Sequence, residues 1–474
     1  MAGRFPLSVE SHVLNMVDRL VPGVTTVTPH ARYYAVHALV AHEAVGRDLS
    51  GKDTQELLRR VEVALAVVST HHDHEVRLPK AHGQDALAGV SPVVLAEAAQ
   101  PGKGGYSSSP WGFWRPYSAS ERALGILEPG GSSLTPGPRS DEAVLRASLG
   151  PLLELAAQEE IGDEAAAFSD PLCLCTAGEA PDGQWLSTIL CGVGDGPTTP
   201  HDRDRRETIS LLARVLATHQ VESLTQDFTE AVAFGEFGVT DEVAASLSIT
   251  SAWQGLLLRN YVVGAWRRLW AWLVNQIESF MPAEELGDRL AAELPNQTVG
   301  AFVDDLPSSI DGNGHTAPVE PALRRSDWPS PCTELAVLAI GARRTKELEG
   351  DSLRAFIGNE RIRDRELSPL WMCRRLEEHR SQHLRDFARE LVRILLARAQ
   401  RIALAKSQRR DDGSLWVPSR VRSRDGHLFA VGTEGSGDVG LRIDQLGSVL
   451  VGAGVLTNAT GHWKVTERGW ALLA

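Results

Sequence analysis

The sequence predicts a mainly α-helical protein with a multi-helix bundle body and one or more small α+β domains. Three observations support this fold class. Apolar residues recur at helical spacing through most of the chain. The segment from Trp253 to Phe280 is apolar on several sides and holds four tryptophans, which is typical of a helix at the centre of a bundle. Strand patterns are confined to short ribbons near residues 125–137 and 455–466.

The length and the charge distribution limit the possible functions. A chain of 474 residues is long enough for two to four structural units of about 100 to 200 residues each. The formal net charge of −13 argues against a protein that coats nucleic acid or an anionic membrane over its whole surface. However, residues 361–424 hold 17 basic and 8 acidic residues, a local net charge of +9. Any contact with nucleic acid is therefore expected at this basic segment.

The cysteines and the apolar segments indicate a cytoplasmic protein. The cysteines include no Cys-x-x-Cys pair, so we expect small buried thiols in a reducing compartment rather than a disulfide framework or a zinc site. Glu10 and Asp18 fall within the only apolar stretch of the first 20 residues, which does not fit a signal peptide. Arg267 and Arg268 interrupt the most apolar segment, so we expect no membrane span. The five cysteines are Cys173, Cys175, Cys191, Cys332 and Cys373.

The first two predicted segments cover residues 1–100 and 101–140. Residues 1–100 form an N-terminal helical region, in which Thr28-Pro29 supplies an N-cap and a first-turn proline and Asp53 with Glu56 supplies a capping box. Residues 101–140 form a Gly/Ser-rich segment with five aromatic residues, which we expect to be ordered against a core.

Three segments follow before the C-terminal domain. Residues 141–294 are predicted to form a central helical domain around the Trp-rich helix, with a loop from Phe168 to Arg205. Residues 295–332 are predicted to be a linker or an ordered loop. Residues 333–407 are predicted to be C-terminal helices, and the last of these has an apolar stripe and an Arg-rich opposite face.

Residues 408–474 form the last predicted segment. Apolar residues recur at helical spacing from Leu441 to Leu450, until Gly452 to Gly454 end the helix. A short two-stranded ribbon follows, and Val465-Thr466-x-x-Gly469 leads into a last helical turn. This helix, hairpin and helical turn resemble the end of a winged-helix domain. The resemblance implies a module that binds DNA or docks on a protein, and residues 101–140 are a possible degenerate second unit of this type.

Two short motifs in the first third of the chain carry another resemblance. Val21 to Thr28 followed by Ala31 to Tyr34, and Tyr106 to Trp111, are similar to a group of uncharacterised bacterial proteins associated with mobile anti-phage defence loci. The similarity implies a cytoplasmic component of a multi-gene defence or DNA-processing system. It transfers no catalytic residues.

Two clusters contain residue types that bind metals. The first runs from His71 to Glu75 at a predicted helix end, where adjacent residues seldom converge on one ion and imidazoles also meet the negative end of the helix dipole. The second lies in a loop, where carboxylates either hold Mg²⁺ or form a turn with Asn and Gly. We expect no cofactor and no bound metal, and we keep a metal-dependent nuclease or hydrolase as the alternative. Its candidate ligands are His71, His72, His74, Asp304, Asp305, Asp311 and His315.

The chain lacks the sequence signatures of nucleotide-driven enzymes, such as a phosphate loop, a dinucleotide fingerprint or a kinase set, and it also lacks the nucleophile elbow of hydrolases. We therefore predict no catalytic residues and favour a non-enzymatic DNA-binding or scaffold subunit of a bacterial anti-phage defence or DNA-processing complex. Its expected partners are other protein subunits of the same operon, and double-stranded DNA is a further candidate partner. A solvated, salt-bridged face is the other interpretation of the basic segment. The predicted DNA contacts are Arg393, Arg401, Lys406, Arg409, Arg410, Arg420, Arg422, Arg424, Lys464 and Arg468.

Overall fold

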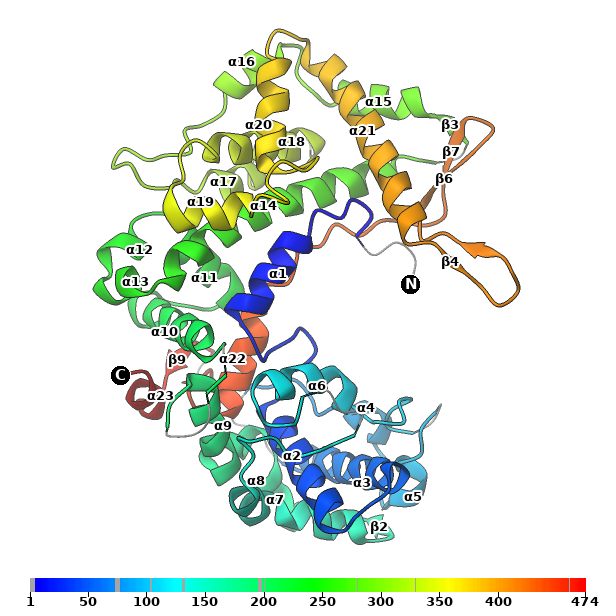
Figure 1. Cartoon of the computed structure of the whole chain (residues 1–474), viewed down its shortest axis with the longest axis vertical. Helices are drawn as coiled ribbons and strands as arrows, with labels where there is room; N and C mark the ends of the chain where they lie inside the picture. Colours follow the sequence, from blue (N-terminus) through cyan, green and yellow to red (C-terminus); the bar gives the residue numbers. More distant parts are fainter. Residues whose placement is uncertain are drawn as a thin grey trace. The chain divides into compact units, whose positions relative to one another are not determined.

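A computed structural model gives the fold of the chain (Figure 1). The chain divides into two compact units, each assembled from segments that are separated in the sequence. Unit 1 comprises Met1–Met16 and Thr229–Gly440, and unit 2 comprises Val17–Phe228 and Leu441–Ala474. The structure describes residues 5–72, 77–102, 105–129, 133–194, 198–199, 201–278, 280–328, 330–459 and 461–474.

The fold class is mainly α, as the sequence predicts. The structure is 58% helical, and its described strands are two to four residues long and lie in small antiparallel sheets. No described helix is both long enough and apolar enough to cross a lipid bilayer. The strand pairs are β1 (Val93–Val94) with β2 (Glu160–Ile161), β4 (Gln408–Arg409) with β5 (Leu415–Trp416), and β8 (Leu456–Thr457) with β9 (Lys464–Val465). A three-stranded sheet has the order β3 (Met281–Pro282), β7 (His427–Ala430), β6 (Val421–Arg424).

Unit 1 is a helical bundle around the 27-residue helix α14 (Ile249–Asn275). Most of α14 is buried, and the side chains of Trp253 and Trp266 are inaccessible to solvent, which agrees with the central position predicted for this Trp-rich helix. Helices α18 and α19 pack on α14, and α15 packs on α21. The described helices of unit 1 after α11 are α12 (Phe237–Thr240), α13 (Glu242–Ser246), α14, α15 (Ala283–Ala292), α16 (Val299–Asp304), α17 (Val319–Arg324), α18 (Ser330–Arg344), α19 (Gly350–Ile357), α20 (Pro369–Glu378) and α21 (Leu384–Ala405).

Gly255 allows α14 and α19 to approach closely. A Cβ atom at this position would collide with the backbone oxygen of Ser352 and lie 2.8 Å from the Cβ of Ala355. Because a backbone oxygen cannot move aside without shifting α19, we expect Gly255→Ala to lower the free energy of unfolding by about 1–3 kcal/mol. Urea denaturation measures this change. Gly150→Ala is the matched helical control, since its Cβ would meet no atom within 4 Å; equal stability of the two variants would contradict the prediction.

Unit 2 is a second helical body, with α2 (Ala31–Gly46) at its centre. Twelve of the 16 residues of α2 are buried, and the helix packs on α3, α7, α9 and α22. The ten-residue helices α1 (Ser11–Leu20) and α11 (Leu224–Ala233) each include residues of both units. The other described helices of unit 2 are α3 (Gly51–Thr70), α4 (Gln84–Leu87), α5 (Leu95–Ala98), α6 (Trp114–Ala123), α7 (Glu142–Ala157), η1 (Asp163–Phe168), α8 (Ser169–Leu172), η2 (Leu174–Glu179), α9 (Pro181–Cys191), α10 (Asp202–Thr218), α22 (Ile443–Gly452) and α23 (Glu467–Leu473).

Two predicted helix starts are wrong. Helix α2 begins at Ala31 rather than Pro29, because Thr28 instead closes a turn in which its hydroxyl oxygen accepts from the Thr25 N–H at 2.8 Å. Helix α3 begins earlier than the predicted capping box. Its N-cap is Ser50, which accepts from the backbone N–H of Asp53 at 3.3 Å and donates to the Asp53 carboxylate at 2.7 Å.

The loop predicted from Phe168 to Arg205 is also wrong. This segment contains α8, η2 and α9, and its glycines and prolines lie near the ends of these short helices. Pro181 occupies the first turn of α9, where its missing N–H costs no hydrogen bond. Residues 295–332, predicted to be a linker or an ordered loop, contain the short helices α16 and α17.

The predicted C-terminal ribbon is present in unit 2, and the described part of the ribbon predicted near residues 125–137 is an isolated antiparallel bridge. Helix α22 ends at Gly452, and Gly454 (φ +71°) leads into β8 and β9. Helix α6 ends at Ala123, and Gly125 (φ +73°) precedes an antiparallel bridge between Leu127 and Pro136. The segment predicted as one winged-helix-like domain, residues 408–474, is divided between the units after Gly440. Its helix and ribbon are confirmed as elements, while the winged-helix resemblance stays a prediction.

Candidate functional site

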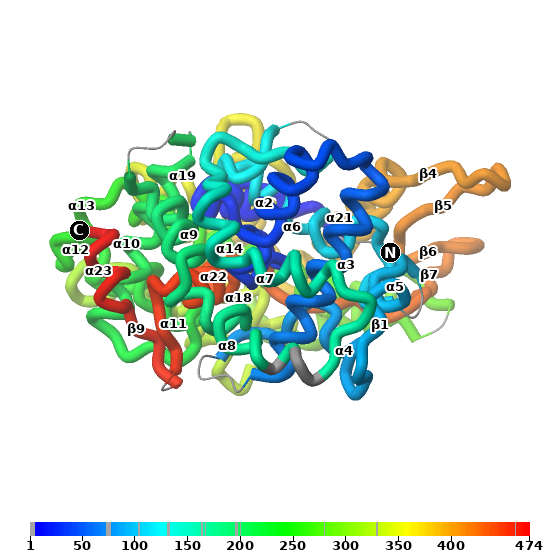
Figure 2. Tube along the Cα trace, turned by 90° about the horizontal axis from the view of Figure 1, so that it is seen from below, coloured from blue at the N-terminus to red at the C-terminus, as the bar shows by residue number. Residues whose placement is uncertain are grey.

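The ten residues predicted to contact DNA fall in both units. Eight lie in unit 1, on α21 and on the hairpins that follow it, while Lys464 and Arg468 lie in unit 2. The view from below in Figure 2 agrees with Figure 1 that the β4–β5 hairpin projects away from the helices of its own unit. The eight residues of unit 1 are Arg393, Arg401, Lys406, Arg409, Arg410, Arg420, Arg422 and Arg424.

Three of these eight side chains are engaged within unit 1. Arg401 pairs with Glu366 at 2.9 Å, and Lys406 donates to the Phe5 carbonyl oxygen at 2.9 Å. Arg420 donates to the carbonyl oxygen of Thr433 and also lies 3.6 Å from the Glu434 carboxylate. Part of the positive charge of the basic segment is therefore neutralised by contacts that hold the unit together.

Besides Arg401, five arginines of the set are exposed, and four of these five have no ion-pair partner among the described residues. The fifth, Arg424, lies 3.7 Å from Asp425, and both of these side chains are at least 75% exposed. Four of the five follow one another along the two hairpins. The five are Arg393 on α21, Arg409 and Arg410 on the β4–β5 hairpin, and Arg422 and Arg424 on β6.

A groove of about 520 Å³ lies between α21 and the β6–β7 hairpin. Its wall is largely apolar, with Trp270, Leu396 and Leu428 among the lining residues, and Arg393 and Arg422 line it as well. Apolar surface combined with guanidinium groups suits a ligand that has both a negative charge and a flat apolar part, as a nucleotide does.

The two predicted contacts in unit 2 differ from each other. Lys464 is exposed on β9, whereas Arg468 donates to the carbonyl oxygen of Gly178 and so anchors α23 to η2. Thr466 caps α23 by accepting from the Gly469 N–H at 2.9 Å. The Thr-x-x-Gly part of the sequence motif thus has a local structural role.

The loop carboxylates considered as metal ligands are engaged elsewhere. The Asp304 carboxylate accepts from Arg380 at 2.6 and 2.8 Å, and Asp305 follows the end of α16. Asp311 accepts from the backbone N–H groups of Asn313 and His315, each at 2.9 Å, which makes it a turn residue. In the part of the chain that the structure describes, these side chains do not form a group of three convergent ligands.

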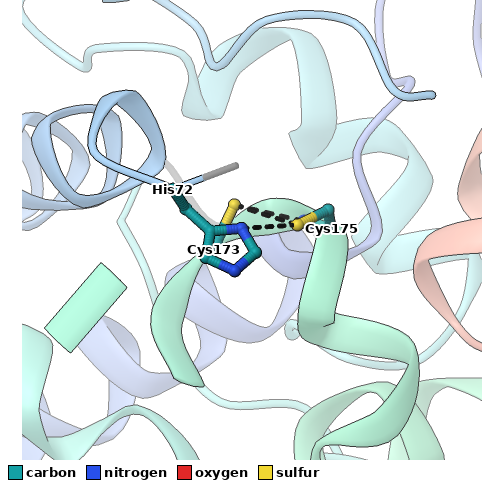
Figure 3. Close-up of side chains that lie close together, drawn as sticks. All are labelled: His72, Cys173 and Cys175. Atoms are coloured by element: carbon teal, nitrogen blue, oxygen red, sulfur yellow. Dashed lines mark hydrogen bonds between the residues drawn. The ribbon is translucent and has the colours of Figure 1, made fainter. Parts of the chain in front are cut away.

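Of the histidine ligands considered at the end of α3, His72 lies in a convergent cluster, but with two cysteines (Figure 3). Its Nδ1 lies 3.1 Å from the Sγ of Cys175, which lies 3.3 Å from the Sγ of Cys173. His71 is exposed at the C-cap of α3, and His74 lies outside the described residues. Sequence reasoning missed Cys173 and Cys175, because it looked for Cys-x-x-Cys; their Cys-x-Cys spacing was the available signal.

A buried network surrounds His37 on α2. Its Nδ1 lies 2.5 Å from Glu121 Oε1 and its Nε2 lies 3.0 Å from Glu62 Oε1, and all three side chains are inaccessible to solvent. The Tyr106 hydroxyl also donates to Glu62. Burial disfavours the imidazolium, but the two carboxylates outweigh burial and raise the pKa of His37 to about 9. Because the network is closed to solvent, we assign it to stability rather than to catalysis.

Two further imidazoles near this network are neutral. His30 Nε2 lies 3.0 Å from the Lys80 carbonyl oxygen, and His82 Nε2 lies 3.1 Å from the Tyr117 hydroxyl. Burial lowers the pKa of His30 to about 3 and the pKa of His82 to about 4. The interior of unit 2 therefore holds histidines of both protonation states at neutral pH.

No family model matches the chain, and comparison with curated proteins and with solved structures finds no similar protein. The function is therefore inferred from the residues and their geometry alone.

Proposed function

We propose that the protein is a non-enzymatic, DNA-binding or scaffold subunit of a bacterial anti-phage defence or DNA-processing complex. In this proposal the arginines of the two hairpins in unit 1 contact the phosphate backbone of double-stranded DNA. Other protein subunits of the same operon are its partners. A cytoplasmic location belongs to the proposal, since the cysteine pattern fits a reducing compartment.

The observation that carries the proposal is the set of exposed arginines at Arg409, Arg410, Arg422 and Arg424. Apart from Arg424, which lies 3.7 Å from the exposed carboxylate of Asp425, these guanidinium groups have no ion-pair partner among the described residues. They are available to a phosphate backbone, which binds through charge rather than through base sequence. The β6–β7 hairpin places Arg422 at the groove that Arg393 also lines. We therefore expect binding that depends strongly on salt and weakly on sequence.

The charge of the rest of the chain supports a role in a complex. The whole chain carries a net charge of −13, although residues 361–424 carry +9. A protein with this distribution repels nucleic acid over most of its length and attracts it at one segment. The acidic helical remainder is suited to basic surfaces on partner subunits.

Replacing Arg409, Arg410, Arg422 and Arg424 with alanine should weaken duplex binding to a similar extent for unrelated sequences. Each lost phosphate contact should flatten the slope of log affinity against log salt concentration by about 0.9. Fluorescence anisotropy with labelled duplexes across a salt series measures this slope. The melting temperature should change little, because these side chains are exposed.

The matched control for this experiment is the double variant Arg363→Ala with Arg374→Ala. Both arginines lie in the same basic segment and are about half exposed, but each is paired with Asp364. We expect this control to bind DNA like the wild type. A salt slope that is the same in all three proteins, or no binding by the wild type at low salt, would rule out DNA contact at the hairpins.

The His72 cluster is the one observation that favours the alternative, a metal-dependent nuclease or hydrolase. A catalytic zinc ion needs three protein ligands and an open position, and His72, Cys173 and Cys175 are three such groups. Cleavage of DNA by the wild type with Zn²⁺, lost in Cys175→Ser while duplex binding is retained, would support the alternative. Intact DNA under these conditions would favour the non-enzymatic role.

A further inference from the structure

We propose that His72, Cys173 and Cys175 form a zinc centre that fixes the C-terminal module, residues 443–473, to the body of unit 2. The proposal concerns unit 2 alone and does not depend on DNA binding by unit 1.

The donor atoms fit zinc in type and in spacing. One imidazole nitrogen and two thiolate sulfurs are typical zinc ligands, whereas Mg²⁺ and Ca²⁺ prefer oxygen. The three donor atoms all lie within 4.8 Å of one another, and the two neighbouring distances are 3.1 and 3.3 Å. Zinc bonds of about 2.0 to 2.3 Å at tetrahedral angles place ligand atoms about 3.4 to 3.8 Å apart. The two neighbouring distances therefore need to lengthen by only a few tenths of an ångström, and the third pair, His72 and Cys173, lies within 4.8 Å and needs to close by at most about 1 Å. A tetrahedral ion has one further position, which these three groups leave open.

The imidazole of His72 has the orientation that zinc-binding histidines share. Its Nδ1 faces the Cys175 sulfur, while its Nε2 lies 3.3 Å from Asp170 Oδ1. A ligating histidine usually donates its second ring N–H to a carboxylate or carbonyl oxygen, which fixes the ring and its tautomer. Asp170 therefore serves as the outer partner of the centre.

The turn that carries the two cysteines is held in place by a buried arginine. Arg32 of α2 donates to the carbonyl oxygens of Cys173 at 2.5 Å and Pro171 at 2.9 Å. Its charge is paired with Asp182 at 3.0 Å, and both side chains are almost completely buried. His72 in turn follows directly on the C-cap of α3. Both halves of the centre are thus attached to helices.

The cysteine-bearing segment contacts the C-terminal module, and so does Arg77, the fifth residue after His72. On the cysteine side, the Gly178 carbonyl oxygen accepts from Arg468, and a Cβ at Gly178 would lie only 2.8 Å from the Gly454 nitrogen. On the histidine side, Asn458 donates to the Arg77 carbonyl oxygen at 3.0 Å and accepts from its N–H at 3.3 Å. A metal ion bound by His72 and the two cysteines would join these two parts of the chain. It would thereby stabilise the surface on which the C-terminal module packs.

Zinc binding at this centre requires no redox partner. Each thiol loses its proton to solvent as a sulfur–zinc bond forms, so two protons leave for each ion that binds. A Cys173–Cys175 disulfide is the competing state, but a disulfide bond is about 2.05 Å long and the sulfurs are 3.3 Å apart.

The first test is the metal content of the full-length protein purified under reducing conditions. Mass spectrometry of the elements should find a stoichiometric amount of zinc in the wild type. The ligand variants His72→Gln, Cys173→Ser and Cys175→Ser should lose it, whereas His71→Gln and Cys373→Ser should keep it. Asp170→Asn should keep the site but raise the Kd for zinc by about 10- to 100-fold in a chelator competition.

A metal substitution covers the case in which a ligand variant fails to fold. Wild-type protein that is stripped of metal, reduced and titrated with Co²⁺ should develop the visible absorption of a tetrahedral cobalt–thiolate complex. A wild type that holds no zinc and takes up neither Zn²⁺ nor Co²⁺ would overturn the centre. A Cys173–Cys175 disulfide combined with that lack of uptake would identify a redox pair instead.

The second test examines the coupling to the C-terminal module. Removing zinc with a chelator should increase hydrogen exchange in α22 and α23, while α14 of unit 1 should exchange at an unchanged rate. Restoring Zn²⁺ should reverse the change, and it should not do so in Cys175→Ser. If zinc leaves and exchange in α22 and α23 stays the same, the proposed coupling is wrong.

Discussion

Replacing Glu320 with alanine should lower the free energy of unfolding of unit 1 by about 3–5 kcal/mol, because it leaves a buried arginine without its counter-charge. The Glu320 carboxylate accepts from Arg344 Nε at 2.6 Å and from Nη2 at 2.7 Å, and both side chains are 1% exposed. Arg344 also donates to the carbonyl oxygens of Ser309 and Ala317. An arginine does not lose its proton in a protein, so the variant retains an uncompensated charge.

Two further variants separate the loss of the counter-charge from other effects. The double variant Glu320→Leu with Arg344→Met removes both charges and should recover most of the lost stability. Glu377→Ala breaks an ion pair with Lys346 in which both side chains are more than half exposed, so it should have a much smaller effect. Urea denaturation of the three variants gives the comparison. The interpretation fails if Glu320→Ala is no less stable than Glu377→Ala.

The local stability of unit 2 should be greatest near pH 6.5, because its buried histidines respond to pH in opposite directions. The pKa of His37 rises from 6.5 to about 9 on folding, so its stabilisation is complete below pH 6.5 and is lost as the pH rises to about 9. This shift corresponds to about 3 kcal/mol. His30 and His82 have folded pKa values of about 3 and about 4. As the pH falls below 6.5, these two histidines bind protons in the unfolded chain but stay neutral in the folded protein. The free energy of unfolding therefore falls again.

Urea denaturation followed by pulsed hydrogen exchange measures this profile for α2, with α14 of unit 1 as an internal reference. His219→Gln is the control, because it changes an exposed histidine at the end of α10. The stability of α2 in this variant should still fall both above and below pH 6.5. A stability of α2 that does not change between pH 6.5 and 9 would contradict the raised pKa of His37.

The sequence correctly predicted the helices and ribbons that are determined by residues close together in the chain. Helix α14 follows from its run of apolar residues, α21 follows from its apolar stripe, and the ribbon after Gly454 and the bridge after Gly125 follow from glycines near the end of a helix. The predicted loop from Phe168 to Arg205 failed because glycine and proline also stand at the ends of short helices. Pro181, at the start of α9, shows why their abundance does not identify a loop.

The contacts that define the candidate sites could not be predicted, because they join residues far apart in the sequence. His72 and Cys175 are 103 positions apart, and His37 and Glu121 are 84 positions apart. The count of basic residues predicted which segment of the chain carries the excess of positive charge. It could not show that Glu366 and Glu434 neutralise Arg401 and Arg420 while the hairpin arginines stay exposed.

The interleaving of the two units affects how the chain is made on the ribosome. Unit 2 includes residues 17–228 and 441–474, so its first part is synthesised before residues 229–440 and its second part after them. During that interval the growing chain lacks α22, and the side of α2 on which α22 packs has no cover. An apolar surface left open for so long favours association with other chains. We therefore expect unit 2 to be the unit that relies on chaperones during translation.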